Sequence, residues 1–549
     1  MTDLAAPRSA SGGTPLPLRL ILAIAAGLGC WLAFPSHNLA PLAWIGTGLL
    51  SYAGWAAGAR RGFLIGLVAG WAYFVPTLSW SGIYVGKLPW GALATLEALY
   101  VAVMVAVVAA LQRRLLARGL GWAAYACVPL GWVVGEWARS TTPFGGFPWA
   151  RLAFSQADAP IAHLAAYGGA PLVTAAVATL GVLGHAGIAG IGGLRAAALP
   201  LGAAALPLGA AALPLGAAAL LAAGPMLLPL PTDGQAARIG LVQGNVPRPG
   251  LDFNAERRAV LDNHVVGTET LGRAERNLDL VVWPENASDI DPLRNPDAAA
   301  QIQRALRAVD APLLVGAILD EPEPAVSNAS LLYRVGSIEP ERYIKQHPVP
   351  FAEYIPYRTF FRAFSDKVDL VRAGFAKGTG PVAFDLETRT GSAVRFAALP
   401  TICFEVAYDG LLRDSVKAAG STPSVLIVQT NNATFGFTAE SEQQFAISRL
   451  RAIEHGRSVV HVSTVGVSGF VAPDGSVGQT SALFTAYGEA KTVPVRSGLT
   501  VADRLGPTPE YAAAAALLVL AAAGRRRRRG GHNESAIPPN RVSKELLRA

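Results

Sequence analysis

The stretch "LPTICFEVAYDG", residues 399–410, places a cysteine and a glutamate directly after a run of apolar residues. The chain has three cysteines, and Cys403 alone lies in a region of ordinary polarity, because Cys30 and Cys127 lie within long apolar segments. So few cysteines, this far apart, exclude a disulfide framework. We therefore expect Cys403 to be a free thiol at the end of a buried strand.

The residues around this stretch predict an α/β domain between residues 231 and 504. Short apolar runs rich in β-branched residues alternate there with helical patterns, as expected for buried sheets covered by helices. The runs are "RIGLVQGNV", "LDLVVWPEN", "APLLVGAIL", "VRFAALPTICFE", "PSVLIVQTNN" and "SVVHVSTVGVSG", and the helical stretches are 254–272, 297–309 and 440–455. In α/β folds, sites form where strands end and loops begin. Three chemically useful residues occupy such places, namely Glu285, Lys345 and Cys403.

A thiol, a carboxylate and an ammonium group can together perform nucleophilic catalysis. A thiol is mostly protonated at neutral pH and needs a base or a nearby cation. Glu285 can accept the thiol proton of Cys403, and Lys345 can stabilise an oxyanion, which is typically worth about 3 kcal/mol per donor. His347 is an alternative partner for the cysteine, as in a Cys–His pair. Spacing alone also leaves structural roles open, such as a small buried cysteine, a glutamate that caps a loop or a solvated lysine.

The composition indicates a membrane protein. Of 549 residues, 52% are hydrophobic and 15% are charged, which is too apolar for an ordinary soluble chain. Residues 231–505 contain 27 lysines and arginines against 31 aspartates and glutamates, so the excess of 8 positive charges belongs to the apolar remainder. There the positive charge clusters at the ends of apolar segments, as orientation signals in a bilayer do. A surface that binds nucleic acid is therefore not expected.

Eight apolar segments are candidates for membrane-spanning helices, which need about 20 residues each. They cover residues 16–34, 38–58, 62–85, 91–111, 119–138, 161–190, 196–230 and 505–524. Every second loop between them is basic, so the positive-inside rule predicts both termini in the cytoplasm and the α/β domain outside. The predicted domains are a cytoplasmic N-terminus (1–14), a seven-span transmembrane domain (15–230), the α/β domain (231–504), a last transmembrane helix (505–524) and a basic, disordered cytoplasmic tail (525–549).

Two features of the apolar segments have less certain interpretations. The segment "ALPLGAAALPLGAAALPLGAAAL" (198–220) repeats one heptad three times, and its prolines disfavour a straight helix. Low-complexity expansion explains this repeat without a function. Glu97 and Glu136 are ionisable residues within or at the end of predicted spans. They have either a functional role in a lipid-facing cleft or a structural one, paired with a neighbouring helix or reaching to the membrane interface. Both interpretations of these glutamates stay open.

The motifs of the α/β domain, taken in order, resemble a known superfamily. "VVWPEN", "YIKQHPVPFAEYIPYR", "TICFEVAYDG" and "TNNATFGFTAESEQQF" are similar to the motifs of the carbon–nitrogen hydrolase (nitrilase) superfamily, which has a Glu-Lys-Cys triad. The flanking apolar segments, with "GFPWARLAFSQ" (146–156) and "LVQGNVPR" (241–248), resemble the apolipoprotein N-acyltransferase family in particular. This resemblance implies a multi-span α-helical membrane domain, with about eight transmembrane helices, and an extracytoplasmic α/β nitrilase-like domain built as an αββα sandwich. Thr434 departs from the pattern, because a tryptophan is more usual there.

The resemblance also implies an activity and its residues. Cys403 matches the family's nucleophile, Glu285 its general base and Lys345 its transition-state stabiliser. The implied reaction moves an acyl chain from a membrane phospholipid, through a thioester on the cysteine, to the α-amine of the S-diacylglyceryl-cysteine of lipoproteins. The implied location is the bacterial cytoplasmic (inner) membrane, with the catalytic domain on its outer face.

Three further residues match supporting positions of the family. Glu353 matches a glutamate that keeps the lysine charged, Glu405 an acidic residue beside the nucleophile, and Phe404 the residue whose backbone N–H helps to hold the oxyanion. We expect a monomer without cofactor or metal. Two rival functions remain, a membrane-tethered amidase or nitrilase that hydrolyses a small external C–N substrate, and a catalytically silent module that keeps the fold and binds lipoproteins.

Overall fold

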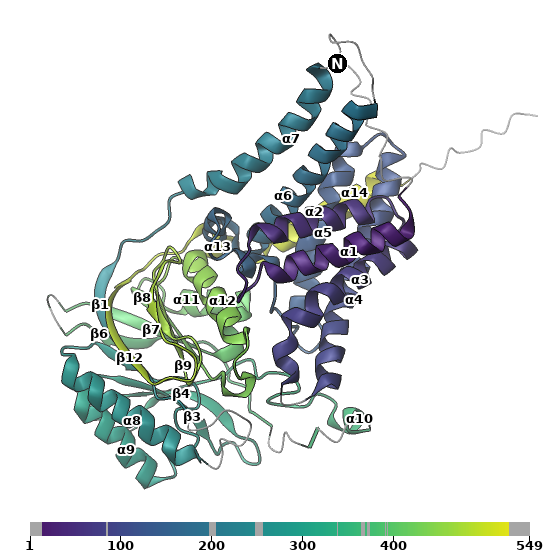
Figure 1. Cartoon of the computed structure of the whole chain (residues 1–549). Coiled ribbons are helices and arrows are strands. Elements are labelled where there is room, and N and C mark those ends of the chain that lie inside the picture. Colours follow the sequence, from purple (N-terminus) through teal and green to yellow (C-terminus); the bar gives the residue numbers. More distant parts are fainter. Residues whose placement is uncertain are drawn as a thin grey trace, which may run out of the picture.

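The chain folds into a helix bundle and an α/β domain that lie side by side (Figure 1). The computed structural model describes residues 14–83, 86–196, 205–246, 256–337, 339–363, 368–369, 374–389, 391 and 393–525. The bundle comprises α1 (Leu16–Leu32), α2 (Pro41–Gly54), α3 (Ala59–Thr77), α4 (Lys87–Leu116), α5 (Gly121–Thr141), α6 (Ala165–Ala196), α7 (Ala205–Ala223) and α14 (Thr508–Ala523). The tail predicted to be disordered, from residue 526 on, lies outside the described residues, as do residues 1–13 and the first part of the heptad repeat.

Each of the eight predicted spans contains a helix, but the helices differ from them in length. Among the described residues, Lys87–Leu116 and Pro160–Ala189 are long and apolar enough to cross a membrane. Helix α2 has 14 residues and is thus about 21 Å long, shorter than a bilayer core of about 30 Å. The predicted 161–190 span is broken near its start, because Gly168 and Gly169 have non-helical dihedral angles. That eight helices cross a membrane therefore stays a prediction.

Small residues let the bundle helices approach one another closely. A Cβ added to Gly66 of α3 would lie 2.7 Å from the carbonyl oxygen of Val101 in α4. One added to Gly70 would lie 2.7 Å from the Cα of Ala98. Close backbone approach at small residues is the usual way in which helices pack without a strong hydrophobic driving force.

The α/β domain is an αββα sandwich, as expected. Within the described ranges, two six-stranded sheets have the orders β12-β1-β2-β3-β4-β5 and β11-β10-β9-β8-β7-β6. The strands are β1 (Gln235–Gln243), β2 (Leu280–Val282), β3 (Leu313–Leu319), β4 (Ser327–Tyr333), β5 (Glu341–Ile344), β6 (Phe384–Glu387), β7 (Arg395–Ile402), β8 (Ser424–Thr430), β9 (Val459–Ser463), β10 (Gly469–Val471), β11 (Val477–Thr480) and β12 (Tyr487–Val495). Apolar side chains from both sheets, among them Val282 and Ile427, fill the space between them.

Helices cover both outer faces of the sandwich. Helices α8 (Arg257–Ala274) and α9 (Pro296–Val309) pack on the first sheet through residues such as Leu261 and Ile302. Helices α11 (Asp409–Ala418) and α12 (Glu440–His455) lie on the second sheet, on the side of the bundle (Figure 1). The remaining described α-helices are the short α10 (Arg358–Arg362) and α13 (Val501–Leu505).

One buried glutamine joins the sandwich to the bundle. Gln443 of α12 accepts hydrogen bonds from the indole nitrogens of Trp80 (3.2 Å) and Trp149 (2.8 Å). Its amide nitrogen donates to the carbonyl oxygens of Pro35 and Thr77. The apolar core is continuous across this junction. The two parts therefore form one packed unit, and the site near α12 lies close to the bundle.

Candidate active site

The three candidate catalytic residues, predicted to follow strands, meet in the sandwich. Glu285 lies in the loop after β2, Lys345 directly follows β5, and Cys403 directly follows β7. The Lys345 Nζ lies 3.3 Å from Glu285 Oε1 and 2.8 Å from the Oε1 of a second carboxylate, Glu353. Glu285 and Lys345 both act electrostatically on the Cys403 thiol. The structure thus brings together residues separated by 118 positions of sequence, from 285 to 403.

Hydrogen bonds fix both carboxylates. Asn328 of β4 donates from Nδ2 to Glu285 Oε1 at 2.7 Å and to Glu353 Oε1 at 3.4 Å. The backbone N–H of Asn431 donates to Glu285 Oε2 at 2.8 Å, and that of Val349 donates to Glu353 Oε2 at 2.6 Å. Asn328 was not among the predicted site residues, and its backbone carbonyl also accepts the Lys345 N–H at 2.9 Å.

The buried charges shift one another's pKa values. Burial raises the pKa of the Cys403 thiol and Glu285 raises it further, whereas Lys345 opposes the rise. Burial also raises the pKa of Glu285, again against the effect of the lysine. Burial alone would lower the pKa of Lys345, but Glu353 and Glu285 together raise it well above its ordinary value. The lysine is therefore a permanent cation, and the glutamate beside it is a better proton acceptor than an exposed carboxylate.

The turn that carries the cysteine is strained and firmly held. Cys403 has a φ of 55°, in the left-handed region that a residue with a side chain seldom adopts. The buried carboxylate of Glu405 accepts from the Ile402 N–H and the Tyr343 hydroxyl, both at 2.8 Å. Its other oxygen accepts from the Gln346 N–H at 2.6 Å. Glu405 thus joins the cysteine turn to the loop that follows Lys345.

The contacts of His347 differ from those of a Cys–His pair, the alternative that its place in the sequence suggested. Its backbone N–H donates to Glu405 at 3.0 Å, and its ring stacks on Tyr408 at 4.5 Å between ring centroids. Burial lowers the pKa of His347, and Lys377 lowers it further. Among the described residues no hydrogen bond joins the His347 ring to the Cys403 thiol, so a Cys–His pair has no support from the geometry. In the same ranges, no group of three or more His, Cys, Asp or Glu side chains is placed to hold a metal ion.

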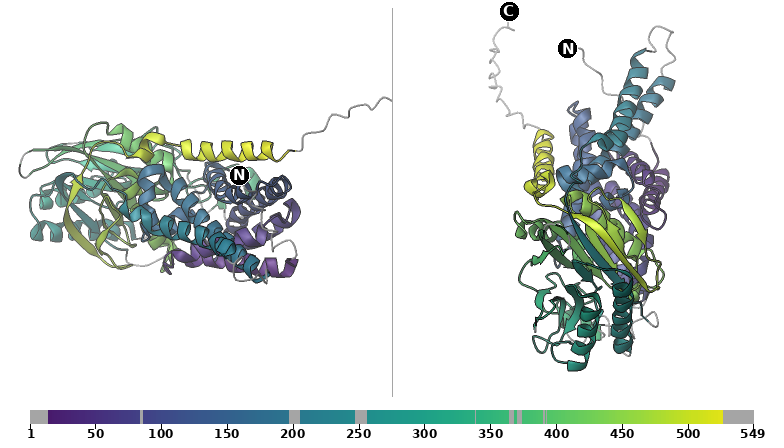
Figure 2. Two further views of the ribbon diagram at one scale, coloured as in Figure 1. Left: turned by 90° about the horizontal axis from the view of Figure 1, so that it is seen from above. Right: turned by 90° about the vertical axis from the view of Figure 1, so that its left-hand side faces the viewer.

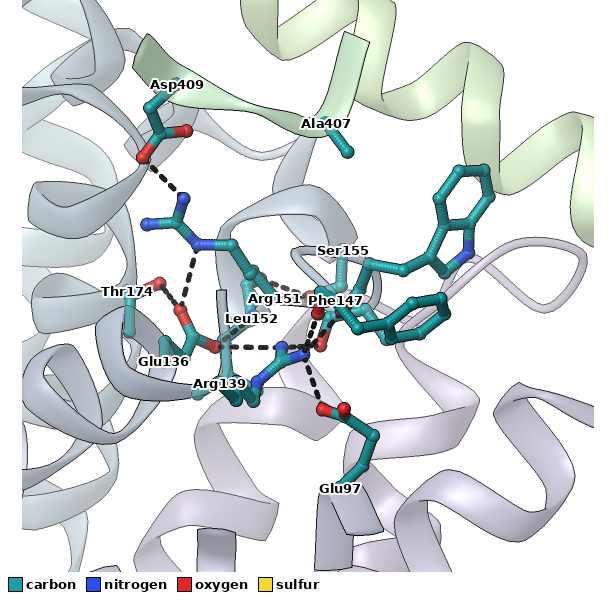
Figure 3. Close-up of polar contacts among 12 residues, drawn as sticks. Glu97, Glu136, Arg139, Phe147, Arg151, Leu152, Ser155, Thr174, Ala407 and Asp409 are labelled. Atoms are coloured by element: carbon teal, nitrogen blue, oxygen red, sulfur yellow. Dashed lines mark hydrogen bonds and ion pairs between the residues drawn. The ribbon is translucent and has the colours of Figure 1, made fainter. Parts of the chain in front are cut away.

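The loop 146–156 lies against the cysteine turn. Trp149 stacks on Phe404 with 5.4 Å between centroids and an interplanar angle of 6°, and Phe147 stacks on it at 5.3 Å. Arg139 of α5 donates to the carbonyl oxygens of Phe147 (3.1 Å) and Trp149 (2.7 Å), and it pairs with Glu97 at 3.0 Å (Figure 3). Buried charges of the bundle therefore shape the aromatic surface beside Cys403.

The comparisons with known proteins agree with this architecture. Residues 26–183 match the model of the apolipoprotein N-acyltransferase N-terminal domain. The chain is 39% identical over 530 residues to the apolipoprotein N-acyltransferase of Mycolicibacterium smegmatis, an alignment that covers 89% of this chain and 82% of that protein. The chain belongs to the apolipoprotein N-acyltransferase family. The family member of Ralstonia nicotianae is 33% identical over 520 residues, covering 90% of this chain and 92% of its own.

The protein is therefore an acyltransferase. Among solved structures, an amidase from Nesterenkonia sp. is similar at 14% identity with a TM-score of 0.33, covering 49% of this chain and 93% of that chain. The stretch of the chain that matches the family model, 26–183, includes both Glu97 and Glu136.

The second of these glutamates belongs to a buried ionic network that enters the sandwich (Figure 3). Glu136 accepts from Thr174 Oγ1 at 2.7 Å, and its Oε2 lies 3.5 Å from Arg151 Nε. Arg151 pairs with Asp409 at 2.6 Å, and Asp409 also pairs with Arg451 at 2.6 Å. Glu97 and Glu136 thus pair with neighbouring elements, which was one of the two interpretations left open by the sequence.

Proposed function

We propose that this protein transfers an acyl chain from a membrane phospholipid to the α-amine of the S-diacylglyceryl-cysteine of lipoproteins. The observation that carries the proposal is the buried Glu285–Lys345 pair acting on Cys403 beside a helix bundle. A soluble substrate needs no such bundle, whereas two lipid substrates reach a site from within a membrane. The name of the family supports lipoproteins as the acceptor in this proposal.

In the proposed first step, Cys403 becomes acylated. Its Sγ attacks the ester carbonyl carbon of the phospholipid while Glu285 takes the thiol proton. Lys345 Nζ and the backbone N–H of Phe404 hold the oxyanion, because donors at the site of developing negative charge lower the barrier. The ester C–O bond then breaks, and the lysophospholipid leaves with the proton from Glu285. A thioester remains on the cysteine.

In the proposed second step, the thioester is consumed by an amine. The neutral α-amine of the lipoprotein attacks the thioester carbonyl carbon, and Glu285 takes a proton from its nitrogen. The C–S bond breaks, and the Cys403 thiolate recovers that proton. Water must be kept away, since hydrolysis of the thioester would make the enzyme a phospholipase. Stacked Phe147, Trp149 and Phe404 supply an apolar wall suited to this.

We further propose that the bundle lies in the membrane with the α/β domain on its outer face. Large apolar side chains on its helices are more than half exposed, among them Ile21, Ile45, Val103, Val107 and Leu518. In water such a surface is unfavourable, and in a bilayer it is the expected one.

Charge at the far end of the bundle supports the orientation. Arg118 donates to the Ala523 carbonyl at 2.8 Å, so the basic loop after α4 meets the end of α14. A Cβ on Gly58, directly before α3, would lie 2.6 Å from the Arg113 guanidinium. The basic start of α3 therefore lies at the same end of the bundle as the basic end of α4. Helix α14 runs from the α/β domain to this end (Figure 2). Basic residues gathered at one end favour the cytoplasmic side.

Peptide mass spectrometry tests the acyl-enzyme directly. Purified protein is incubated with phospholipid and digested with trypsin, and peptide 396–413, which contains Cys403, is expected to gain one acyl mass. Adding a diacylglyceryl-cysteine lipopeptide should remove that mass and yield N-acylated peptide. Cys403→Ser should stay unmodified, because a carboxylate base generates an alkoxide far less readily than a thiolate. Turnover without the adduct would remove Cys403 from the mechanism, and release of free fatty acid or of a small amine product would favour a hydrolase.

A further inference from the structure

A buried glutamine donates to the sulfur of Cys403. Gln444 of α12 is fully buried, and its Nε2 lies 3.8 Å from Cys403 Sγ within hydrogen-bonding geometry. The mechanism described above gives this amide no role. Burying a polar group costs free energy unless it makes hydrogen bonds, so the contacts of this amide are expected to be specific.

The neighbours of Gln444 fix which end of its amide faces the sulfur. Its Oε1 accepts from Thr430 Oγ1 at 2.8 Å and from Asn432 Nδ2 at 2.9 Å. With the oxygen held by two donors, the NH₂ group is the end that is left for Cys403. The side chain therefore presents a donor to the sulfur and cannot turn its oxygen there without losing both bonds.

Asn432 is oriented in the same way by its own partners. Its Oδ1 accepts from the hydroxyl groups of Ser463 (2.5 Å) and Ser441 (3.4 Å). Its Nδ2 donates to the buried carboxyl of Glu440 at 2.7 Å as well as to Gln444. The chain of contacts thus runs from Glu440 through Asn432 and Gln444 to Cys403, and each step fixes the direction of the next.

The charged groups near the Cys403 thiol are compatible with a neutral hydrogen-bond donor beside the sulfur. Glu285 from the loop after β2, Lys345 from the loop after β5 and Glu440 from the start of α12 act electrostatically on Cys403, and the Thr430 side chain also hydrogen-bonds to it. Burial raises the pKa of Glu440 to about 8, with Asn432 opposing the rise and Glu285 adding to it. At neutral pH Glu440 is mostly uncharged, so it orients Asn432 without placing a full negative charge near the thiolate.

We propose that Gln444 is a further catalytic residue, which donates a hydrogen bond to the Cys403 thiolate, and that Asn432 and Glu440 are its positioning residues. The donor acts when Glu285 removes the thiol proton, and again when the C–S bond of the thioester breaks and the thiolate leaves. The proton itself moves only between Sγ and Glu285. The inference rests on the proposed function in so far as Cys403 is the nucleophile there.

Thiol reactivity tests the donor without any lipid substrate. The full chain in detergent is treated with iodoacetamide across about pH 6 to 10, and alkylation of peptide 396–413 is followed, so that Cys30 and Cys127 do not interfere. Gln444→Met keeps the size but removes the donor. We expect its alkylation profile to move to higher pH by about one unit, which makes the reaction about tenfold slower below both midpoints. Gln444→Glu keeps the acceptor oxygen but replaces the NH₂ donor with a carboxyl group. We expect it to move the alkylation profile to higher pH at least as far as Gln444→Met does.

A buried residue of the same helix gives the control. Ser448, one turn along α12, is also fully buried, but its Oγ bonds to His461 Nδ1 at 2.8 Å. Ser448→Ala should leave the alkylation profile unchanged. Profiles of both Gln444 variants that coincide with the unsubstituted protein overturn the proposal.

A double substitution tests the positioning role. Asn432→Ser should move the profile of the unsubstituted protein but add nothing in the Gln444→Met background, since it acts through that amide. An additive shift would show that Asn432 acts on the thiol by itself and would overturn its positioning role. Failure of the proposed function is a separate result, because it would abolish the acyl adduct on the unsubstituted protein and leave these alkylation profiles as they are.

Discussion

At the scale of single residues, the compact charge of Lys345 is the feature on which the mechanism depends most. Its ammonium is buried between two carboxylates, 2.8 and 3.3 Å away. Lys345→Arg keeps the positive charge but replaces a point donor with a planar fork that does not fit this space. We expect thioester formation to slow by about 100-fold or more, nearly as much as in Lys345→Ala. Acyl-enzyme formation on peptide 396–413 measures the rate, and a rate for the arginine variant close to the normal one would contradict the assignment.

The carboxylate of Glu353 supports that charge. It lies closest to the ammonium and raises the pKa of Lys345 more than Glu285 does. Glu353→Gln keeps a hydrogen-bonding side chain but no longer favours the charged lysine, so we expect slower thioester formation with an intact fold. Glu387→Gln, at the exposed end of β6, serves as the control. A normal rate of thioester formation combined with failed transfer to the amine would assign Glu353 to the second step instead.

Sequence could identify some residues of the site and not others. Glu285 and Cys403 follow strands that the apolar runs predict, whereas β5, which precedes Lys345, was not among the predicted strands. Asn328 lies inside β4 and Gln444 inside α12, where nothing local distinguishes a polar residue with a role from a structural one. Their contacts depend on the pairing of strands and helices far apart in the chain, and a sequence pattern does not contain that information.

At the scale of elements, two of the strands that were missed, the edge strands β5 and β12, share a physical cause. The predicted strands are apolar runs of a largely buried sheet, and β1, β2, β3, β7, β8 and β9 match them. Strand β12 has only two buried residues among nine, and β5 has four residues in all, of which one is buried. Edge strands need few apolar residues, so hydrophobic runs do not reveal them. The prediction of an αββα sandwich therefore relied on resemblance where the periodicity was weak.

The ionic contact between the loop 146–156 and α11 gives a prediction at this scale. Arg151→Met leaves Asp409 with one partner instead of two in a buried place, and breaking such a pair costs about 3 to 5 kcal/mol. We expect a lower midpoint of thermal unfolding in detergent. Adding Asp409→Asn should recover part of the loss, because the carboxylate that has lost one of its two cations is removed with it. A double variant as unstable as the sum of the two single ones would mean that the two residues do not interact.

At the scale of the whole molecule, one end of the bundle meets the sandwich and the other collects positive charge. The indole groups of Trp80 and Trp149 bind Gln443 at the first end, and the Arg118 guanidinium meets the end of α14 at the second. A site for two lipids has to be reached along a membrane surface, and a sandwich held at one end of a membrane bundle satisfies that need. The proposed function therefore requires the proposed membrane topology, with the sandwich at the outer face.

Reporter fusions test that topology. A reporter joined after Arg529 should be active only in the cytoplasm, and one inserted at Pro322, in the loop between β3 and β4, only outside. The expectation follows from an even number of crossings with basic loops inside. Among the predicted crossings, α2 has the least support, because its 14 residues are short for a bilayer core. If α2 does not cross, the number of crossings becomes odd, and with the N-terminus in the cytoplasm the two reporters would exchange sides, because α14 alone lies between them. That result would overturn the eight-span arrangement while leaving the geometry around Cys403 untouched.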